Sequence, residues 1–288
     1  GNWTTRKDVR FVRVMCSGNK PAKTFNNEWM TITKSNIGPE IGIGHYVGHV
    51  TEAPVLILKS CIGNRSLGWD LLPPGSPPYT YEGKEIPGYG QTADGTPKEQ
   101  APDSWYAGTQ YDGDVAAAKR VLDDLSTYYP DAIEYEVAGF FWWQGDKDFR
   151  NNAHAAKYEE NLMNLIDALR KDFDAPEAKF VAATLGQTKK DATGNQGKIL
   201  QAVLNIDGES GVYPQNQGLV ASVYSHPLSK GGSSSGHYGG NAETYQNIGE
   251  AMGKAMAQLL LDDPDHDKGS ISVVEDSAAP KNTKSNNN

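Results

Sequence analysis

Short apolar runs alternate with longer amphipathic stretches along this chain. The runs are nearly continuous rather than alternating between apolar and polar residues, which is typical of strands in a parallel sheet covered on both faces. Five runs are predicted to be strands: residues 9–15, 55–59, 137–143, 179–185 and 219–224.

Apolar residues that recur every three or four positions predict helices between these strands. The first helix is expected to run from Pro39 to about His49, because Pro39 stands at an early helical position and Glu40 in the first turn. Further helices are predicted over residues 114–128, 156–173, 198–205 and 242–261. Strands alternating with helices predict an α/β fold, a three-layer α/β/α sandwich.

The organisation along the chain favours one domain over residues 1–263. Residues 73–112 hold many Pro, Gly and Tyr residues without periodicity. That segment is too long for a simple connection, so it is predicted to be an irregular insertion facing the substrate. Residues 264–288 form a polar tail that we expect to be disordered.

Composition narrows the possible partners. The net charge of -9 and the pI of about 5.2 argue against nucleic acid and anionic membrane surfaces, which require a basic face. No run of apolar residues is long enough for a transmembrane helix. Cys16 and Cys61 do not form a Cys-x-x-Cys pattern, so two buried thiols are favoured, with a disulfide as the alternative.

A polar turn, Gly63-Asn64, follows the second predicted strand. Ligands of open α/β folds bind at the carboxyl ends of the strands, and exposed N–H groups there can stabilise an oxyanion. The alternative is a turn that only ends the strand. Ser66 suggests a Gly-x-Ser-x-Gly nucleophile elbow, but Asn64 stands where the first glycine should be. Ser66 is therefore not favoured as a nucleophile.

A second polar turn, Gln144-Gly145-Asp146, follows the aromatic strand over residues 137–143. Gln144 can donate to an oxyanion or to a sugar hydroxyl. Asp146 can bind a hydroxyl or cap the next helix, and Trp143 can stack on a sugar ring. For Asp148, helix capping or solvation is the favoured interpretation.

His237 lies between a glycine-rich loop and the last predicted helix. An unperturbed histidine has a pKa near 6.5, which suits a general base, although an ordinary polar loop residue is the alternative. His45 and His49 have a spacing compatible with metal binding, but no third ligand follows, so neither a metal nor another cofactor is predicted. His154 and His226 show no informative context.

Several motifs occur together in one order: residues 38–44, 55–59, 63–70 with 73–76, 139–148 and 237–252. In this combination the chain resembles the sialate O-acetylesterase family of carbohydrate esterases, within the SGNH hydrolases. The resemblance runs from about Trp3 to Leu261.

The resemblance implies a parallel, flavodoxin-like sheet and a Ser-His catalytic pair with an acid. It further implies removal of O-acetyl groups from carbohydrate, without a cofactor, in an extracellular or periplasmic protein. By position, Gly63 takes the oxyanion role, Gln144 belongs to the family's Trp-x-Gln-Gly block, and His237 is the general base. The residues expected to contact substrate are Asn64, Trp69, Trp143, Gly145 and Asp146.

Two departures from the family matter. Its nucleophile serine lies in a Gly-Gln-Ser-Asn-Met block after the first, central strand, and these 288 residues contain no such block. A chain truncated at its amino-terminal end is favoured, while a strand supplied by another chain and an outright loss are the alternatives. The family also places an Asp three residues before the histidine, where this chain has Ser234.

The leading hypothesis is therefore a carbohydrate O-acetylesterase-like hydrolase in a truncated copy that would not catalyse the reaction alone. The alternative is a catalytically silent SGNH-like domain that binds glycans through aromatic rings. Those rings would be Trp69, Trp105, Tyr106 and Trp143. No sequence feature indicates an oligomeric state.

Overall fold

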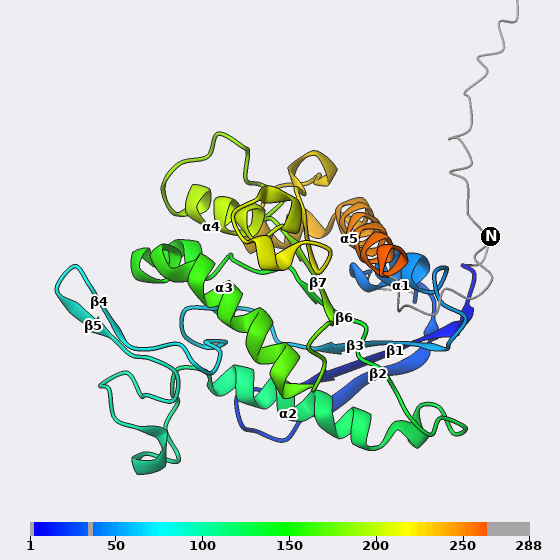
Figure 1. The fold of residues 1–288 in the computed structure, drawn as a ribbon, viewed down its shortest axis with the longest axis horizontal. Coiled ribbons are helices and arrows are strands. Elements are labelled where there is room, and N and C mark those ends of the chain that lie inside the picture. Colours follow the sequence, from blue (N-terminus) through cyan, green and yellow to red (C-terminus); the bar gives the residue numbers. More distant parts are fainter. Residues whose placement is uncertain (1–2, 34–36, 264–288) are drawn as a thin grey trace, which may run out of the picture.

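A computed structural model gives the fold and describes residues 3–33 and 37–263. Two three-stranded sheets lie between layers of helices, so the α/β sandwich predicted from the sequence is confirmed (Figure 1). One sheet has the order β2-β1-β3 and the other the order β6-β7-β8. The strands are β1 (Arg6–Met15), β2 (Lys23–Met30), β3 (Val55–Ser60), β6 (Gly139–Trp142), β7 (Lys179–Ala183) and β8 (Val220–Val223).

All five predicted strands are present, with small differences at their ends. Strand β3 pairs with β1 in parallel, and β6, β7 and β8 are parallel to one another. Strand β2 pairs with β1 antiparallel and was not predicted. It lies at the edge of its sheet and only Met30 is buried, so its sequence lacks the apolar run of a covered strand.

The predicted helices are also present. They are α1 (Glu40–Val47), α2 (Thr109–Asp123), α3 (Asn152–Asp172), α4 (Gly194–Asn205) and α5 (Ala242–Asp262). Helices α3 and α5 begin at asparagine caps, where the side chains of Asn151 and Asn241 accept backbone N–H groups of the first turn. Helix α2 begins well before the expected residue, because the polar side chain of Gln110 in its first turn is buried rather than solvated.

Helices α1 and α5 cover one face of the sheets and lie side by side (Figure 1). A Cβ atom on Gly42 would overlap the backbone of α5, and one on Gly249 would overlap Pro39, so glycines permit this close packing. The apolar cluster beneath the two helices contains residues from both sheets. It includes Ile43, Val181, Val223, Ile248 and Met252, with Val55, Ile57 and Phe141 partly buried against it.

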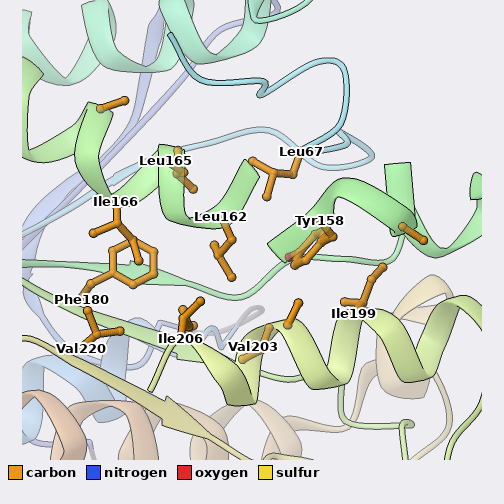
Figure 2. Packing of buried hydrophobic residues seen from close by; sticks show 14 of the residues in the cluster. Leu67, Tyr158, Leu162, Leu165, Ile166, Phe180, Ile199, Val203, Ile206 and Val220 are labelled. Atoms are coloured by element: carbon orange, nitrogen blue, oxygen red, sulfur yellow. The ribbon is translucent and has the colours of Figure 1, made fainter. Parts of the chain in front are cut away.

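The opposite face has two clusters. Helices α3 and α4 pack over β6, β7 and β8, with Tyr158, Leu162, Ile166, Phe180, Ile199 and Val203 at the centre (Figure 2). Helix α2 packs over β1, where Val12, Val14 and Val121 are buried and Leu56 and Leu58 of β3 lie against them.

Each sheet ends in a strand with one unpaired edge among the described residues, β3 in one sheet and β6 in the other. Within the described residues, β3 and β6 each end the strand order of their sheet and have no strand partner on the second edge. Every residue of β3 and β6 is only half-buried, whereas every residue of β7 is buried. Val55 and Ile57 of β3 and Phe141 of β6 pack against the same cluster under α1 and α5, so one apolar cluster spans the two sheets although no pairing of the described strands joins them.

The segment expected to be an irregular insertion, residues 73–112, is more regular than predicted. It contains the hairpin of β4 (Tyr79–Tyr81) and β5 (Lys84–Ile86), a 3-10 turn and the first residues of α2. An isolated antiparallel bridge between Thr92 and Tyr106 closes the loop between these two residues. The predicted disordered tail, residues 264–288, lies outside the described residues.

Both cysteines are free thiols, as favoured from the sequence, but only Cys16 is buried. Cys61 is exposed after β3, so the expectation that both would be buried is wrong for that residue. None of the described helices has the length and apolar character needed to cross a membrane.

Candidate active site at the carboxyl ends of β3 and β6

The loops that follow β3 and β6 are tied together. Gln144 donates its side-chain Nε2–H to the Arg65 carbonyl oxygen at 2.8 Å. The backbone N–H groups of Leu67 and Gly68 donate to the Asp148 carboxylate at 2.9 and 2.8 Å. The two sequence motifs singled out for chemistry therefore meet at one edge, although no hydrogen bond joins the strands that lead to them.

Asp148 is the centre of this connection. Its side chain is fully buried and accepts from Leu67 N, Gly68 N and Gln144 Nε2. Burial raises the pKa of Asp148 to about 6, although these three hydrogen bonds oppose the shift. The expectation that Asp148 caps a helix or is solvated is wrong, because the fold carries a distant loop over the carboxylate.

His154, for which the sequence shows no informative context, lies beside Asp148. Its Nδ1 is 4.0 Å from Asp148 Oδ1 and has no hydrogen-bond partner in the described part of the chain. Burial lowers the pKa of His154. The ring packs directly on Gly68, where a Cβ atom would lie 2.5 Å from His154 Cγ, so only glycine fits there. The proximity to the Asn151 cap was the only sequence signal for this position.

The side-chain amide of Gln144 has hydrogen-bond partners at both its nitrogen and its oxygen. Its two amide hydrogens are donated to Arg65 O and Asp148 Oδ2, and its Oε1 is 3.1 Å from the Tyr158 hydroxyl. Tyr158 is completely buried. Donation from Gln144 to a substrate oxyanion stays a prediction, and it would require one of these hydrogen bonds to be exchanged.

The turn at Gly63 and Asn64 is open. Both residues are exposed, and a Cβ atom on Gly63 would meet no other atom within 4 Å. Asn64 has a φ of 59°, which is uncommon for a residue other than glycine. Among the described residues, neither N–H group donates a hydrogen bond. Two unsatisfied N–H groups at the end of β3 can stabilise an oxyanion.

Ser66 is unsuited to nucleophilic attack. It is only 1% exposed, and its N–H and hydroxyl both donate to Asp70 Oδ2, at 3.0 and 3.2 Å. A buried hydroxyl bound to a carboxylate has no path to a substrate.

We expect Ser66→Ala to leave the hydrolysis of an aryl acetate by this chain at the rate of the uncatalysed reaction, the same as for the unsubstituted chain. The burial of the hydroxyl against Asp70 is the reason. Release of the aryl alcohol, followed by absorbance, measures the rate. Turnover above the buffer rate that disappears in Ser66→Ala would restore the nucleophile-elbow interpretation.

The loop that carries His237 is docked on the residues after β6. The Ser234 hydroxyl donates to Asp146 Oδ1 at 2.6 Å, and Gln187 donates to Ser234 Oγ at 2.9 Å. The ring of Tyr238 stacks on Trp143, with centroids 5.5 Å apart and planes 10° apart. Both flanks of His237 are thus fixed to the edge that carries Gln144.

His237 itself is exposed and has a φ of 50°, and Tyr238 has a φ of 51°. Two consecutive non-glycine residues in the left-handed region are costly, and such conformations cluster at functional sites. The exact separation of the His237 ring from Gln144 stays a prediction. The docking of its loop on Asp146 and Trp143 is consistent with a common site.

The aromatic rings proposed to bind sugars differ in accessibility. One face of Trp143 is covered by Tyr238, and the Trp143 Nε1–H donates to a backbone carbonyl. Tyr106 is buried. Trp69 and Trp105 are half-buried. Stacking of a sugar on Trp143 or Trp69 stays a prediction, and Tyr238 and Tyr245 already contact the Trp143 ring.

His45 of α1 and His49, just after that helix, contact other protein groups. His49 Nδ1 is 2.7 Å from Arg6 Nη1, and the rings of His45 and His49 are 4.5 Å apart. Across residues 3–33 and 37–263, no group of three His, Cys, Asp or Glu side chains is arranged to hold a metal ion.

A protein-family model described as carbohydrate esterase, sialic acid-specific acetylesterase, matches residues 99–258, more than half of the chain. The chain belongs to this family. The match covers Gln144, Asp146 and His237 of this carbohydrate esterase domain, and it begins after Gly63.

Two solved structures resemble the esterase domain. One is a protein from Arabidopsis thaliana, with 13% identity and a TM-score of 0.51 over 88% of this chain and 82% of that chain. The other is a novel carbohydrate acetylesterase from Xanthomonas citri, with 13% identity and a TM-score of 0.51. There the alignment covers 88% of this chain and 49% of the other, so the domain spans about half of that protein. At this identity the likeness shows the fold. No curated protein sequence matches the chain significantly.

Proposed function

We propose that this domain belongs to a carbohydrate O-acetylesterase that removes acetyl groups from sugars by serine acyl transfer. The hydrogen bond between Ser234 and Asp146 carries the proposal, because it docks the histidine loop on the residues that follow β6. The open N–H groups of Gly63 and Asn64 lie on the loop that is tied to the same residues through Arg65. These ties support a common site for the proposed base and the proposed oxyanion donors.

In this proposal Asp146 serves as the catalytic acid. Ser234 stands where the resemblance implies an acid, and its hydroxyl donates to Asp146 Oδ1 at 2.6 Å. The other oxygen of Asp146 is 3.3 Å from Arg150 Nη2. A carboxylate beside the histidine fixes its tautomer and stabilises the imidazolium. The resemblance implies a carboxylate at position 234 of the histidine loop. In this chain Asp146, on the loop after β6, would take over that role.

The serine nucleophile would arrive on a strand between β3 and β6, from polypeptide outside residues 1–288. Strands β3 and β6 both lead into the loops that Gln144 and Asp148 tie together. Their facing edges are unpaired within the described chain, and their apolar side chains are half-buried. A parallel strand added there would satisfy both edges and end beside Gly63 and Gln144.

The reaction would proceed in two acyl transfers. The serine oxygen attacks the acetyl carbonyl while His237 accepts the serine proton, and the Gly63 and Asn64 N–H groups hold the oxyanion. The proton then passes from His237 to the departing sugar oxygen, which leaves as the free hydroxyl. Water attacks the acetyl-serine in the same way, and acetate leaves.

An assay with an aryl acetate tests this proposal. We expect the 288-residue chain to hydrolyse it at the uncatalysed rate and the same chain, extended upstream to include a serine block, to turn it over. The same extended protein with that serine changed to Ala is the matched control. Release of acetate from acetylated sugars, measured in parallel, shows whether carbohydrate is the substrate. An inactive extended protein that still binds acetylated sugar would instead favour the silent glycan-binding domain.

A further inference from the structure

The side chain of Arg65, next to the open turn, is held by three groups. Its Nε–H donates to Gln110 Oε1 at 3.1 Å, and its Nη2–H donates to Ser17 Oγ at 3.1 Å. Its guanidinium lies over the Trp105 ring, 4.9 Å from the centroid. The planar guanidinium group is suited to such fixed, forked contacts. Arg65 therefore fastens the loop after β3 to α2 and to the end of β1.

Gln110, which accepts the hydrogen bond from Arg65, lies in the protein interior. It is completely buried in the first turn of α2, and its Oε1 also accepts from Gly18 N at 2.9 Å. Its Nε2 donates to Cys16 O at 3.2 Å and to Asp114 Oδ1 at 2.8 Å. Both acceptor positions and both hydrogens of the amide are in use, so its orientation is fixed.

Asp114 lies one turn further along α2 and is buried. Its Oδ1 accepts from Gln110, and its backbone carbonyl accepts from the hydroxyl of Ser60, the last residue of β3, at 2.7 Å. The helix lies so close to the end of β1 that a Cβ atom on Gly113 would overlap Gly18. Helix α2 is thus bound to the carboxyl ends of both β1 and β3.

We propose that Arg65 and Gln110 are positioning residues that hold the Gly63 and Asn64 N–H groups toward a developing oxyanion, with Asp114 fixing the amide of Gln110. This rests on the proposed function, because the oxyanion role of the turn belongs to it. Donors without internal hydrogen bonds stabilise charge effectively only when the surrounding structure already orients them. Within the part of the chain that the structure describes, the N–H groups of Gly63 and Asn64 donate no hydrogen bond, so we assign the ordering of the turn to the neighbouring Arg65.

The protonation state of Asp114 bears on this network. Burial raises its pKa to about 7. The groups from other elements that act on Asp114 are Arg65, after β3, and the Cys16 thiol, after β1, which donates to Asp114 Oδ1 at 3.6 Å. Asp114 in turn raises the pKa of the Cys61 thiol, after β3. The ionised carboxylate accepts a stronger hydrogen bond from Gln110 than the neutral acid does. The turn should therefore be more ordered above that pKa than below it.

Backbone order parameters from ¹⁵N relaxation of the 288-residue chain test the proposal. We expect values near 0.85 for Gly63 and Asn64 in the unsubstituted chain, and values below about 0.6 in Arg65→Lys and Gln110→Glu. Arg65→Lys keeps the positive charge but removes the planar guanidinium that donates to both Gln110 and Ser17. Arg120→Lys, the same change on the exposed face of α2, is the matched control and should leave both values unchanged.

A second arm uses pH. Between about pH 5.5 and about pH 8.5, on either side of the Asp114 pKa of about 7, the Asn64 order parameter should rise in the unsubstituted chain. Asp114→Asn keeps the acceptor oxygen but cannot titrate, so this rise should disappear. A turn that is already mobile in the unsubstituted chain, or one as ordered in Arg65→Lys as in Arg120→Lys, overturns the proposal. A turn that loosens as expected, in a protein without esterase activity, would support the positioning network and refute the esterase.

Discussion

Asp148→Ala is expected to lower the free energy of unfolding by about 3–5 kcal/mol, the largest stability effect of any single change at this site. The Asp148 carboxylate is fully buried and accepts from Leu67 N, Gly68 N and Gln144 Nε2. Its removal leaves three donors without an acceptor, each costing roughly 1–3 kcal/mol when buried. Urea unfolding followed by circular dichroism measures the change.

Two variants serve as controls for Asp148. Asp191→Ala, at an exposed position, should change the free energy of unfolding by less than about 0.5 kcal/mol. Asp148→Asn keeps one acceptor oxygen and should cost less than Asp148→Ala. If Asp148→Ala were no more destabilising than Asp191→Ala, the loops after β3 and β6 would not be held together by this carboxylate.

The pH dependence of the free energy of unfolding provides an independent test of the burial of Asp148. Burial raises the pKa of Asp148 from 3.8 to about 6, so the folded protein binds this proton more tightly than the unfolded chain. The resulting stabilisation is fully present below pH 3.8 and is lost as the pH rises through about 6. Relative to Asp148→Asn, which cannot titrate, the unsubstituted protein should lose stability across this window, by at most about 3 kcal/mol.

His237→Ala is expected to lower kcat for an aryl acetate by about 10²–10⁴-fold in the protein extended to include the serine block. KM should change much less, because the imidazole acts mainly in the transition state. The motivating observations are the exposure of His237 and the docking of its loop through Ser234 and Tyr238. Steady-state kinetics at several substrate concentrations separate kcat from KM.

Ser235→Ala is the matched control for His237, because Ser235 is an exposed residue of the same loop. It should retain nearly full activity. If Asp146 is the acid that orients His237, adding Asp146→Asn to His237→Ala should slow the reaction little further, since residues that act as one unit have non-additive effects. A His237→Ala protein with nearly full activity would show that the histidine is structural.

The strands that could be predicted from the sequence are those buried under helices. Residues 180–183 of β7 are buried on both faces, so the sequence there is a continuous apolar run with no polar face. Strand β2 and the β4–β5 hairpin could not be found in this way. They are exposed, and their positions follow from pairing with a neighbouring strand rather than from an apolar pattern of their own.

Part of the candidate site could be predicted for a similar reason. Polar turns after buried strands indicated Gly63 and Gln144, and the structure ties their loops together through Arg65. Asp148 could not be predicted, because its burial depends on a loop from the other sheet, and a carboxylate soon after a turn is ordinarily solvated. The bond from Ser234 to Asp146 likewise depends on how two distant loops meet.

The division into two sheets also has a consequence for how the site assembles. The Gly63-Asn64 turn, proposed to hold the oxyanion, follows β3 in one sheet, whereas Gln144 and the loop of His237 lie with the other. The two halves are joined by the glycine-mediated crossing of α1 and α5 and by the buried Asp148 bridge. The cluster under α1 and α5 is shared by both halves, whereas the clusters under α2 and under α3 and α4 lie mostly within one half each. We expect local opening of this seam to disrupt the shared cluster and to separate the proposed base from the proposed oxyanion donors, so catalytic competence would be lost at lower denaturant than secondary structure.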